Sequence, residues 1–459
     1  MLWERSAVDL QCLIARREVS AVEVVTAFLE RIEAVNPMVN AIVTLVPGRA
    51  LAEAAAADRA RTPRGPLHGL PIAIKDLVDT EGIRTTYGSP LYADHVPDAD
   101  AWLVRRLREA GAIVVGKTNT PEFGAGSQTF NPVFGVTRNP YDLSRTAGGS
   151  SGGAASAVAA GMLPFADGSD LGGSLRNPAS FCNVVGLRPT PGRVPDPERD
   201  DLWEPLTVIG PVARTVGDAA LLLGVLAEPL SVPLALGAWR PPATDADMRG
   251  MRVAWSRDLG GLPVDPSVTN ALEQMRPVLA DLGCEVVEAE PDLADADEVF
   301  HVLRALGFVR RHGEEVRAHR NSVKETIVWN VEQGLALAPE RIARAQSRRS
   351  ELFRHMTAFL GRYQALALPA SLVPPFPAEQ EWVAEIAGVH LGTYLDWMRA
   401  CTRISVTAHP AISIPFAFTP DGLPVGLQLV GRYGDECRLL ELAAGIEAAA
   451  GASQRRPQL

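Results

Sequence analysis

The chain has 459 residues, of which 47% are hydrophobic and 21% charged, and its formal net charge is −10 at pH 7. This length is enough to bury a large hydrophobic core without disulfides or metals. The net negative charge provides no attraction to nucleic acid or to an anionic membrane surface, so we expect neither as a partner.

The spacing of cysteines and histidines argues against a metal centre. The five cysteines form no Cys-x-x-Cys pair, and the eight histidines form no closely spaced pair, so we expect no metal. An odd number of thiols in a long chain is typical of a reducing compartment and predicts a cytoplasmic protein. The first residues do not resemble a signal peptide, and charge and proline interrupt the longest apolar region, residues 219–239, so we expect no membrane segment.

Helix and strand patterns alternate in the N-terminal half. A Ser-x-x-Glu capping box at residues 20–23 precedes apolar residues at helical spacing up to residue 35. Further elements are expected in this order: a helix over about 49–61, a strand over 70–75 that ends in Lys75, a helix over 98–110, a strand over 112–116 and a helix over 154–161. This alternation favours an α/β fold with helices layered on a mixed sheet.

The C-terminal half continues in the same way around a long helical part. Residues 293–362 show a helical, arginine-rich pattern with interleaved acidic residues, which is typical of solvated helix faces. The other expected elements are a capped helix from 215–218 onward, strands over 251–255, 285–288, 411–415 and 425–430, and a helix over 267–282. Because we find no repeat and no long linker, we expect one domain, residues 1–459, with a helical excursion in its C-terminal half.

The glycine- and serine-rich stretch at residues 147–153 raises the first functional question. A flexible linker would not lead directly into a helix, and a Walker loop needs lysine and then serine or threonine after its last glycine. Two catalytic interpretations remain. In the first, the pattern G-x-S-x-G makes Ser151 the nucleophile of a hydrolase elbow, with His390 or His409 as its base.

The second interpretation uses another glycine pair, in the segment 169–176. Glycines let the backbone approach a ligand, and successive N–H groups can then point at one oxygen atom to form an oxyanion hole. Ser174 at the end of this turn would be the nucleophile. Serine needs a base, and a neutral lysine can serve as one. Lys75 follows an apolar strand, where burial would lower its pKa.

Three motifs at fixed separations resemble those of the amidase signature family. They are G-x-P-x-x-x-K-D at 69–76, G-G-S-S-G-G at 148–153 and D-x-G-G-S-x-R at 170–176. The resemblance covers nearly the whole chain and is densest over residues 65–220 and 405–432. It implies the amidase signature fold, in which helices cover both faces of a central, mixed, twisted β-sheet. It also implies a variable helical region on the substrate side, at about residues 293–400.

The resemblance implies a Ser–cis-Ser–Lys triad. Ser174 is then the nucleophile that accepts the acyl group, Ser150 is the bridging serine on a cis peptide bond, and Lys75 is the base. This chemistry needs neither a metal nor a cofactor. The further residues that the family pattern implies are the oxyanion-hole backbone of Leu171, Gly172, Gly173 and Ser174, the supporting side chains of Ser151, Asp170 and Arg176, and Gly124 near the acyl channel.

The motifs specify hydrolysis of C–N acyl bonds and leave the acyl group open. Aromatic residues of the variable region could line an apolar pocket or simply pack in the core; they are Trp329, Trp382, Tyr394 and Trp397. We can place no convergent charges in that region. The sequence therefore favours a hydrophobic or aromatic amide, anilide or carbamate as a small-molecule substrate, with esters as further candidates.

Two functional hypotheses follow from this resemblance. The first is a stand-alone amidase, such as an aryl acylamidase or a urethane hydrolase. The alternative is the glutamine-hydrolysing A-type subunit of a tRNA-dependent amidotransferase. Residues 203–211 are more similar to stand-alone amidases than to that subunit. Assembly into a homodimer stays open.

Overall fold

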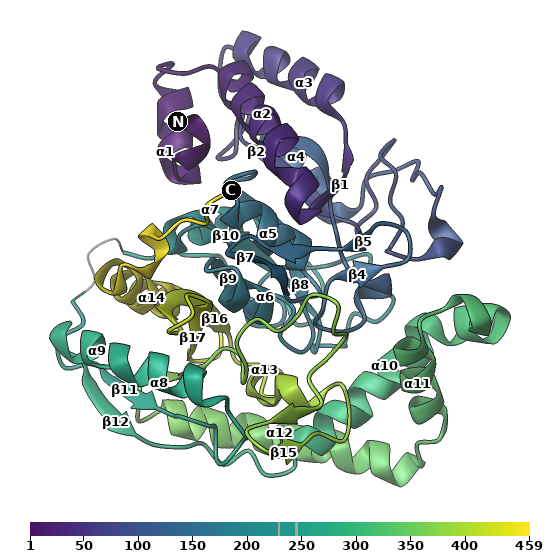
Figure 1. Ribbon diagram of the computed structural model, residues 1–459, viewed down its shortest axis with the longest axis vertical. Helices are drawn as coiled ribbons and strands as arrows, with labels where there is room; N and C mark the ends of the chain where they lie inside the picture. Colours follow the sequence, from purple (N-terminus) through teal and green to yellow (C-terminus); the bar gives the residue numbers. More distant parts are fainter. Residues whose placement is uncertain (228–229, 244–246) are drawn as a thin grey trace.

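The computed structural model describes residues 1–227, 230–243 and 247–459, so residues 228 and 229 of the apolar region 219–239 lie outside it. Its centre is an eight-stranded mixed sheet in the order β12-β11-β13-β17-β16-β9-β10-β8 (Figure 1). The strands are β8 (Phe165–Asp170), β9 (Val185–Arg188), β10 (Val208–Ala213), β11 (Arg252–Trp255), β12 (Glu285–Glu288), β13 (Ala365–Pro369), β16 (Ala411–Phe418) and β17 (Pro424–Val430). β11 runs parallel to both β12 and β13, whereas the other pairs are antiparallel.

Helices cover both faces of this sheet, as predicted. Alternate side chains of a strand point to opposite faces, so each strand can contribute to two hydrophobic cores. In β13, Ala365 and Ala367 belong to one hydrophobic core, and Leu366 and Leu368 belong to another. The first core is built with α1 (Ala7–Ala15), α2 (Ala21–Val39), α4 (Trp102–Glu109), α7 (Val216–Leu226), α8 (Pro266–Met275), α9 (Pro277–Asp281) and α14 (Glu436–Ala450). The second is built with α6 (Arg176–Phe181), α10 (Ala296–His319), α12 (Pro339–Leu360) and α13 (Arg399–Ser405).

Local sequence signals account for several helix boundaries. The capping box of α2 is confirmed, because Ser20 Oγ accepts the Glu23 N–H at 3.1 Å and the Glu23 carboxylate accepts the Ser20 N–H at 2.8 Å. The single helix expected over 267–282 is instead α8 followed by α9. Pro277 explains the break, because proline has no N–H to continue the helix. Among the described residues, no helix is long and apolar enough to cross a membrane.

A second, three-stranded sheet lies beside the main one. Its order is β1-β3-β2, with β1 (Ile42–Leu45), β3 (Ile113–Thr118) and β2 (Pro71–Lys75). β2 lies against β8, and the backbone N–H of Lys75 donates to Asp167 Oδ1 at 2.9 Å. α3 (Pro47–Arg59) contacts β3, α5 (Gly152–Ala159) contacts β2, β3 and β8, and both helices contribute to a third hydrophobic core. The end of β2 therefore places Lys75 at the boundary between the two sheets.

The helical excursion begins where the sequence predicts it. α10, α11 (Glu325–Leu335) and α12 lie at the end of the molecule opposite α1 to α3 (Figure 1). The expectation that this region stays helical to residue 400 is corrected. β13 is an inner strand of the main sheet, and most of residues 370–398 form loops and short ladders. A short apolar run such as β13 does not reveal by its periodicity whether it is a strand or a buried helix.

Three other strands of the main sheet were not predicted from the sequence. β8, β9 and β10 form consecutive antiparallel pairs, and they carry glycine, aspartate or proline that weakens a strand pattern. The short ladders pair β4 (Phe130–Asn131) with β5 (Gly135–Val136), β6 (Arg138–Asn139) with β7 (Asp142–Thr146), and β14 (Glu385–Ile386) with β15 (Val389–His390). β8 matters most for function, because the turn that follows it carries Ser174.

Candidate active site

The side chain of Lys75, at the end of β2, is enclosed by hydroxyl groups. Lys75 is 1% exposed. Its Nζ lies 2.8 Å from Ser150 Oγ, 2.9 Å from Ser151 Oγ and 3.2 Å from Ser169 Oγ. The geometry thus brings together the lysine and two of the serines that the sequence motifs single out.

The protonation state of Lys75 follows from this environment. Burial lowers the pKa of Lys75 to about 7, although the negative charges of Asp167 and Asp170 act in the opposite direction. Above that pH the amine is mostly neutral, whereas an ordinary lysine would be charged. A charged ammonium can only donate hydrogen bonds, but a neutral amine can also accept one. A neighbouring hydroxyl can therefore pass its proton towards Nζ.

The glycine- and serine-rich stretch is buried and closely packed, so it is not a flexible linker. The peptide bond between Gly149 and Ser150 is cis. The N–H of Ser151 donates to the C=O of Ser174 at 3.2 Å, which ties this stretch to the turn after β8. Gly153 has no room for a side chain, since a Cβ there would lie 2.4 Å from a backbone nitrogen of the loop after β3.

A buried carboxylate holds the turn after β8. Asp170 accepts two hydrogen bonds from Arg176, at 2.9 and 3.0 Å, and one from the Gly173 N–H at 2.8 Å. Arg188 Nη1 lies 3.3 Å from the same carboxylate. Burial alone would raise the pKa of Asp170, but the two guanidinium groups outweigh it and hold that pKa well below its usual range. Asp170 therefore stays ionised and fixes the turn that carries Ser174.

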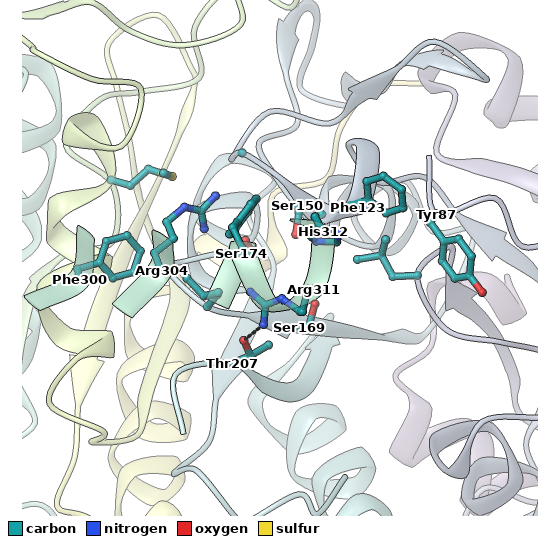
Figure 2. A pocket seen from close by; sticks show the side chains of 17 residues that line it. Tyr87, Phe123, Ser150, Ser169, Ser174, Thr207, Phe300, Arg304, Arg311 and His312 are labelled. Atoms are coloured by element: carbon teal, nitrogen blue, oxygen red, sulfur yellow. Dashed lines mark hydrogen bonds between the residues drawn. The ribbon is translucent and has the colours of Figure 1, made fainter. Parts of the chain in front are cut away.

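Ser174 and the backbone before it face the same pocket as Ser150 (Figure 2). Leu171, Gly172 and Ser174 line this pocket, and their N–H groups donate to no other group among the described residues. The expectation for Gly173 is corrected, because its single N–H is already engaged by the carboxylate of the turn. Within the part of the chain that the structure describes, the hydroxyls of Ser150 and Ser174 are not hydrogen-bonded to each other.

A comparison with protein families identifies the chain. The Amidase family model matches residues 23–440. The chain belongs to the amidase signature family. It is accordingly an enzyme that hydrolyses amide bonds.

Curated and solved relatives of this amidase include more than one activity. The acylamidase of Rhodococcus erythropolis is 35% identical over 98% of this chain and 97% of that protein. The A-type subunit of the glutamyl-tRNA(Gln) amidotransferase of Moorella thermoacetica is 38% identical over 100% of this chain and 99% of that protein. The crystal structure of a bacterial aryl acylamidase of the amidase signature family matches with a TM-score of 0.92 and 27% identity, over 98% of this chain and 97% of the other.

The amidase pocket has a volume of about 270 Å³, and five of the 17 residues that line it are aromatic. The aromatic residues that line it are Tyr87, Phe123, Phe300, Phe308 and His312. Burial, together with the charges of Arg311 and Arg304, lowers the pKa of His312 to about 3, so its imidazole is neutral at neutral pH. Gly124, for which the family resemblance implies a place near the acyl channel, also lines the pocket, and a Cβ there would lie 2.9 Å from a Leu77 methyl group.

The aromatic residues suggested by the sequence for the pocket lie elsewhere. Trp397 is 1% exposed and stacks on Phe181 in the core. The Tyr394 hydroxyl accepts a hydrogen bond from Arg304, so Tyr394 contacts a pocket residue without lining the pocket itself. Trp329 and Trp382 also lie outside the pocket lining. Core packing, the alternative explanation, thus fits Trp397.

The residues that α10 contributes to the pocket were not predicted from the sequence. Phe300, Arg304, Phe308 and Arg311 are spaced by three or four positions, so they lie on one face of this helix. The spacing was visible in the sequence, but nothing in it showed that this face meets the turn after β8. The sequence alone allowed no charge to be placed in the pocket, whereas in the structure Arg304 and Arg311 both line it.

The hydrolase-elbow interpretation fails on geometry. Ser151 Oγ contacts Lys75 and no histidine among the described residues. His409 is buried outside the pocket, with its Nδ1 2.8 Å from the Thr407 C=O. His390 lies on the surface beside β14. Neither histidine can act on a substrate in the pocket.

Proposed function

We propose that this amidase cleaves C–N acyl bonds through a covalent acyl-enzyme on Ser174, with Ser150 as the proton relay and Lys75 as the base. The 2.8 Å contact between Lys75 Nζ and Ser150 Oγ carries the proposal. A buried amine whose pKa is lowered to about 7 is a proton acceptor at neutral pH, and this hydroxyl is its shortest contact.

Acylation begins with two coupled proton transfers. Ser150 passes its proton to Lys75 Nζ and takes the proton of Ser174, whose Oγ attacks the substrate carbonyl carbon. This transfer needs a hydrogen bond between the two serine hydroxyls, which the described residues do not form in the structure. Such contacts often tighten only when substrate is bound. The C–N bond then breaks, and Ser150 returns a proton to the nitrogen so that it leaves as a neutral amine.

The backbone around Gly172 supplies the groups that stabilise the negative charge on the carbonyl oxygen. The N–H groups of Leu171, Gly172 and Ser174 face the pocket and have no other acceptor among the described residues. Loss of one donor of this kind lowers kcat by about 100- to 1000-fold. In the second half-reaction, water gives a proton to the same relay and attacks the acyl-enzyme, which releases the acid and restores Ser174.

Aromatic walls support amides and anilides with an apolar or aromatic part as substrates. Carbamates and esters present the same electrophilic carbonyl to Ser174, and we propose them as further substrates of this mechanism. The amidotransferase alternative has less support, although A-type subunits from several bacteria are 33–38% identical to this chain. An acylamidase matches over 98% of the chain, and an aryl acylamidase structure matches with a TM-score of 0.92.

Labelling with a fluorophosphonate tests the nucleophile without knowledge of the substrate. We expect the purified chain to be labelled on Ser174 and to hydrolyse members of a panel of nitroanilides, primary amides, esters and carbamates without a partner. The Ser174→Ala variant should show neither labelling nor turnover. Undiminished labelling of that variant would contradict the role of Ser174. If the chain instead hydrolysed only glutamine, and only together with partner proteins, the amidotransferase alternative would be favoured.

Two further variants distinguish loss of the proton relay from a general effect of changing a buried polar residue. Lys75→Met should lower the labelling rate by several orders of magnitude, because it removes the proton acceptor. Ser156→Ala is the matched control, since Ser156 is a buried serine of α5 whose hydroxyl donates to the Arg138 C=O, outside the pocket. Its labelling rate should equal that of the unmodified chain. If Lys75→Met is labelled as fast as the control, the role of the lysine as base is wrong.

A further inference from the structure

Arg304 brings a guanidinium group into the aromatic pocket without a carboxylate to neutralise it. Its side chain projects from α10 and is 6% exposed. Its Nε donates to Asn330 Oδ1 at 3.2 Å and its Nη2 donates to the Tyr394 hydroxyl at 2.9 Å. Both partners are neutral. Among the described residues, no acidic side chain forms an ion pair with Arg304, and no group accepts a hydrogen bond from its Nη1.

A second guanidinium group, that of Arg311, lies two helical turns further along the same face of α10. Its contacts with the protein are weak: Nη1 lies 3.5 Å from Thr207 Oγ1 and 4.0 Å from Glu204 Oε2. Burial lowers the pKa of Arg311 to about 10, which still leaves it charged at neutral pH. Figure 2 shows both arginines among the side chains that surround Ser174.

The charges in this pocket have one sign. No aspartate or glutamate is among the described residues that line it, and the neighbouring walls are aromatic. A buried charge without a partner of opposite sign is costly, because it gives up hydration without gaining an ion pair. The ring of Phe308 lies 4.4 Å from the Arg304 guanidinium and compensates for a part of this cost. A bound anion would compensate for more of it.

We infer that the pocket takes amide substrates that carry a carboxylate, which Arg304 binds through its unpartnered edge with Arg311 as a second cation. The inference rests on the proposed function, because it specifies the substrate of the same site. Asn330 and Tyr394 hold the guanidinium from behind, so its remaining N–H groups are oriented before the anion arrives. A planar guanidinium held in this way matches the two oxygens of a carboxylate.

Arg304 could instead serve only to connect α10 with α11 and the loop around Tyr394. A purely structural role predicts that its removal affects charged and neutral ligands alike. A role in recognition predicts that removal abolishes the difference between them. The experiment therefore compares pairs of substrates that differ in charge and hardly in shape.

Two such pairs cover the two sides of the scissile bond. On the acyl side, the para-nitroanilide of succinic acid ends in a carboxylate, and that of isocaproic acid ends in an isopropyl group. On the side of the leaving amine, acetylated para-aminobenzoate is paired with acetylated para-isopropylaniline. Binding is measured by calorimetry with the Ser174→Ala variant, so that turnover does not interfere. We expect the carboxylate member of at least one pair to bind about 10- to 100-fold more tightly.

Variants on α10 connect this preference to the arginines. In the Ser174→Ala background, Arg304→Met should abolish most of the preference, and Arg304→Lys should keep a part of it. Arg311→Met should reduce it and remains available if Arg304→Met does not fold. Arg310→Met is the matched control. Arg310 lies on the same helix but is paired with Asp200 at 2.8 Å and Asp201 at 2.6 Å, so the preference should be unchanged.

The outcomes separate this inference from the proposed function. Equal binding of the charged and neutral members in both pairs overturns the inference, even if nitroanilides are hydrolysed. A preference that survives unchanged in both Arg304→Met and Arg311→Met overturns it as well. A carboxylate preference in a chain that hydrolyses no amide and is not labelled on Ser174 would instead contradict the proposed function alone.

Discussion

The dependence of fluorophosphonate labelling on pH tests the state of Lys75 directly. A solvated lysine with a pKa of about 10.5 is neutral in only about 0.03% of molecules at pH 7. Burial lowers the pKa of Lys75 to about 7, which makes about half of the molecules neutral at that pH. The gain in neutral amine is about 1500-fold, equivalent to about 4 kcal/mol. We therefore expect the labelling rate to rise tenfold per pH unit below about pH 7 and to level off above it.

Removal of one neighbouring charge should move this profile in a known direction. The carboxylate of Asp167 raises the pKa of Lys75 against the effect of burial. Burial raises the pKa of Asp167 itself to about 6, so this carboxylate is largely ionised at the midpoint of the lysine. Asp167→Asn keeps an oxygen that can accept the Lys75 N–H and removes the charge. The midpoint should then shift to lower pH by an amount on the order of one unit.

The assay is the second-order rate of labelling between pH 5 and pH 9.5, with circular dichroism to confirm folding at each pH. Asp76→Asn is the matched control, because Asp76 is a neighbouring buried carboxylate whose charge acts on Lys117. Its midpoint should stay near that of the unmodified chain. A rate independent of pH, or a midpoint unmoved by Asp167→Asn, would refute the assignment of this step to Lys75.

Three substitutions test the surrounding framework. Gly172→Ala should lower kcat at least tenfold, because the new Cβ would lie 2.7 Å from the Phe300 ring and displace the backbone from the carbonyl oxygen; wild-type kcat would contradict this. Arg176→Met leaves the buried charge of Asp170 without its main partner and should cost about 3–5 kcal/mol in urea unfolding, whereas a loss below about 1 kcal/mol would show that other groups suffice. Leu368→Ala, in the fully buried β13, should lower the free energy of unfolding by about 2–5 kcal/mol and leave the pH midpoint of labelling unchanged. A shifted midpoint would contradict a purely structural role of Leu368.

Strong local signals predicted individual elements well. The capping box at Ser20 starts a helix because its two hydrogen bonds join residues three positions apart. The run that ends in Lys75 forms β2, a fully buried strand. By contrast, β13 was not predicted, because only its burial between β11 and β17 makes this short apolar run a strand.

The amino-acid sequence by itself determined the family, the candidate nucleophile, relay and base, and the layered α/β architecture. These depend on short motifs and on hydrophobic periodicity, which act over a few residues. Only the tertiary structure decided which side chains form the pocket and which backbone donors remain available in it. Phe300 and Arg304 meet a turn more than 120 positions earlier in the chain, and the Gly173 N–H is taken by a carboxylate that folding places beside it. The physical reason is that burial and contact between distant segments, which set charge and access in this site, arise only when the chain packs.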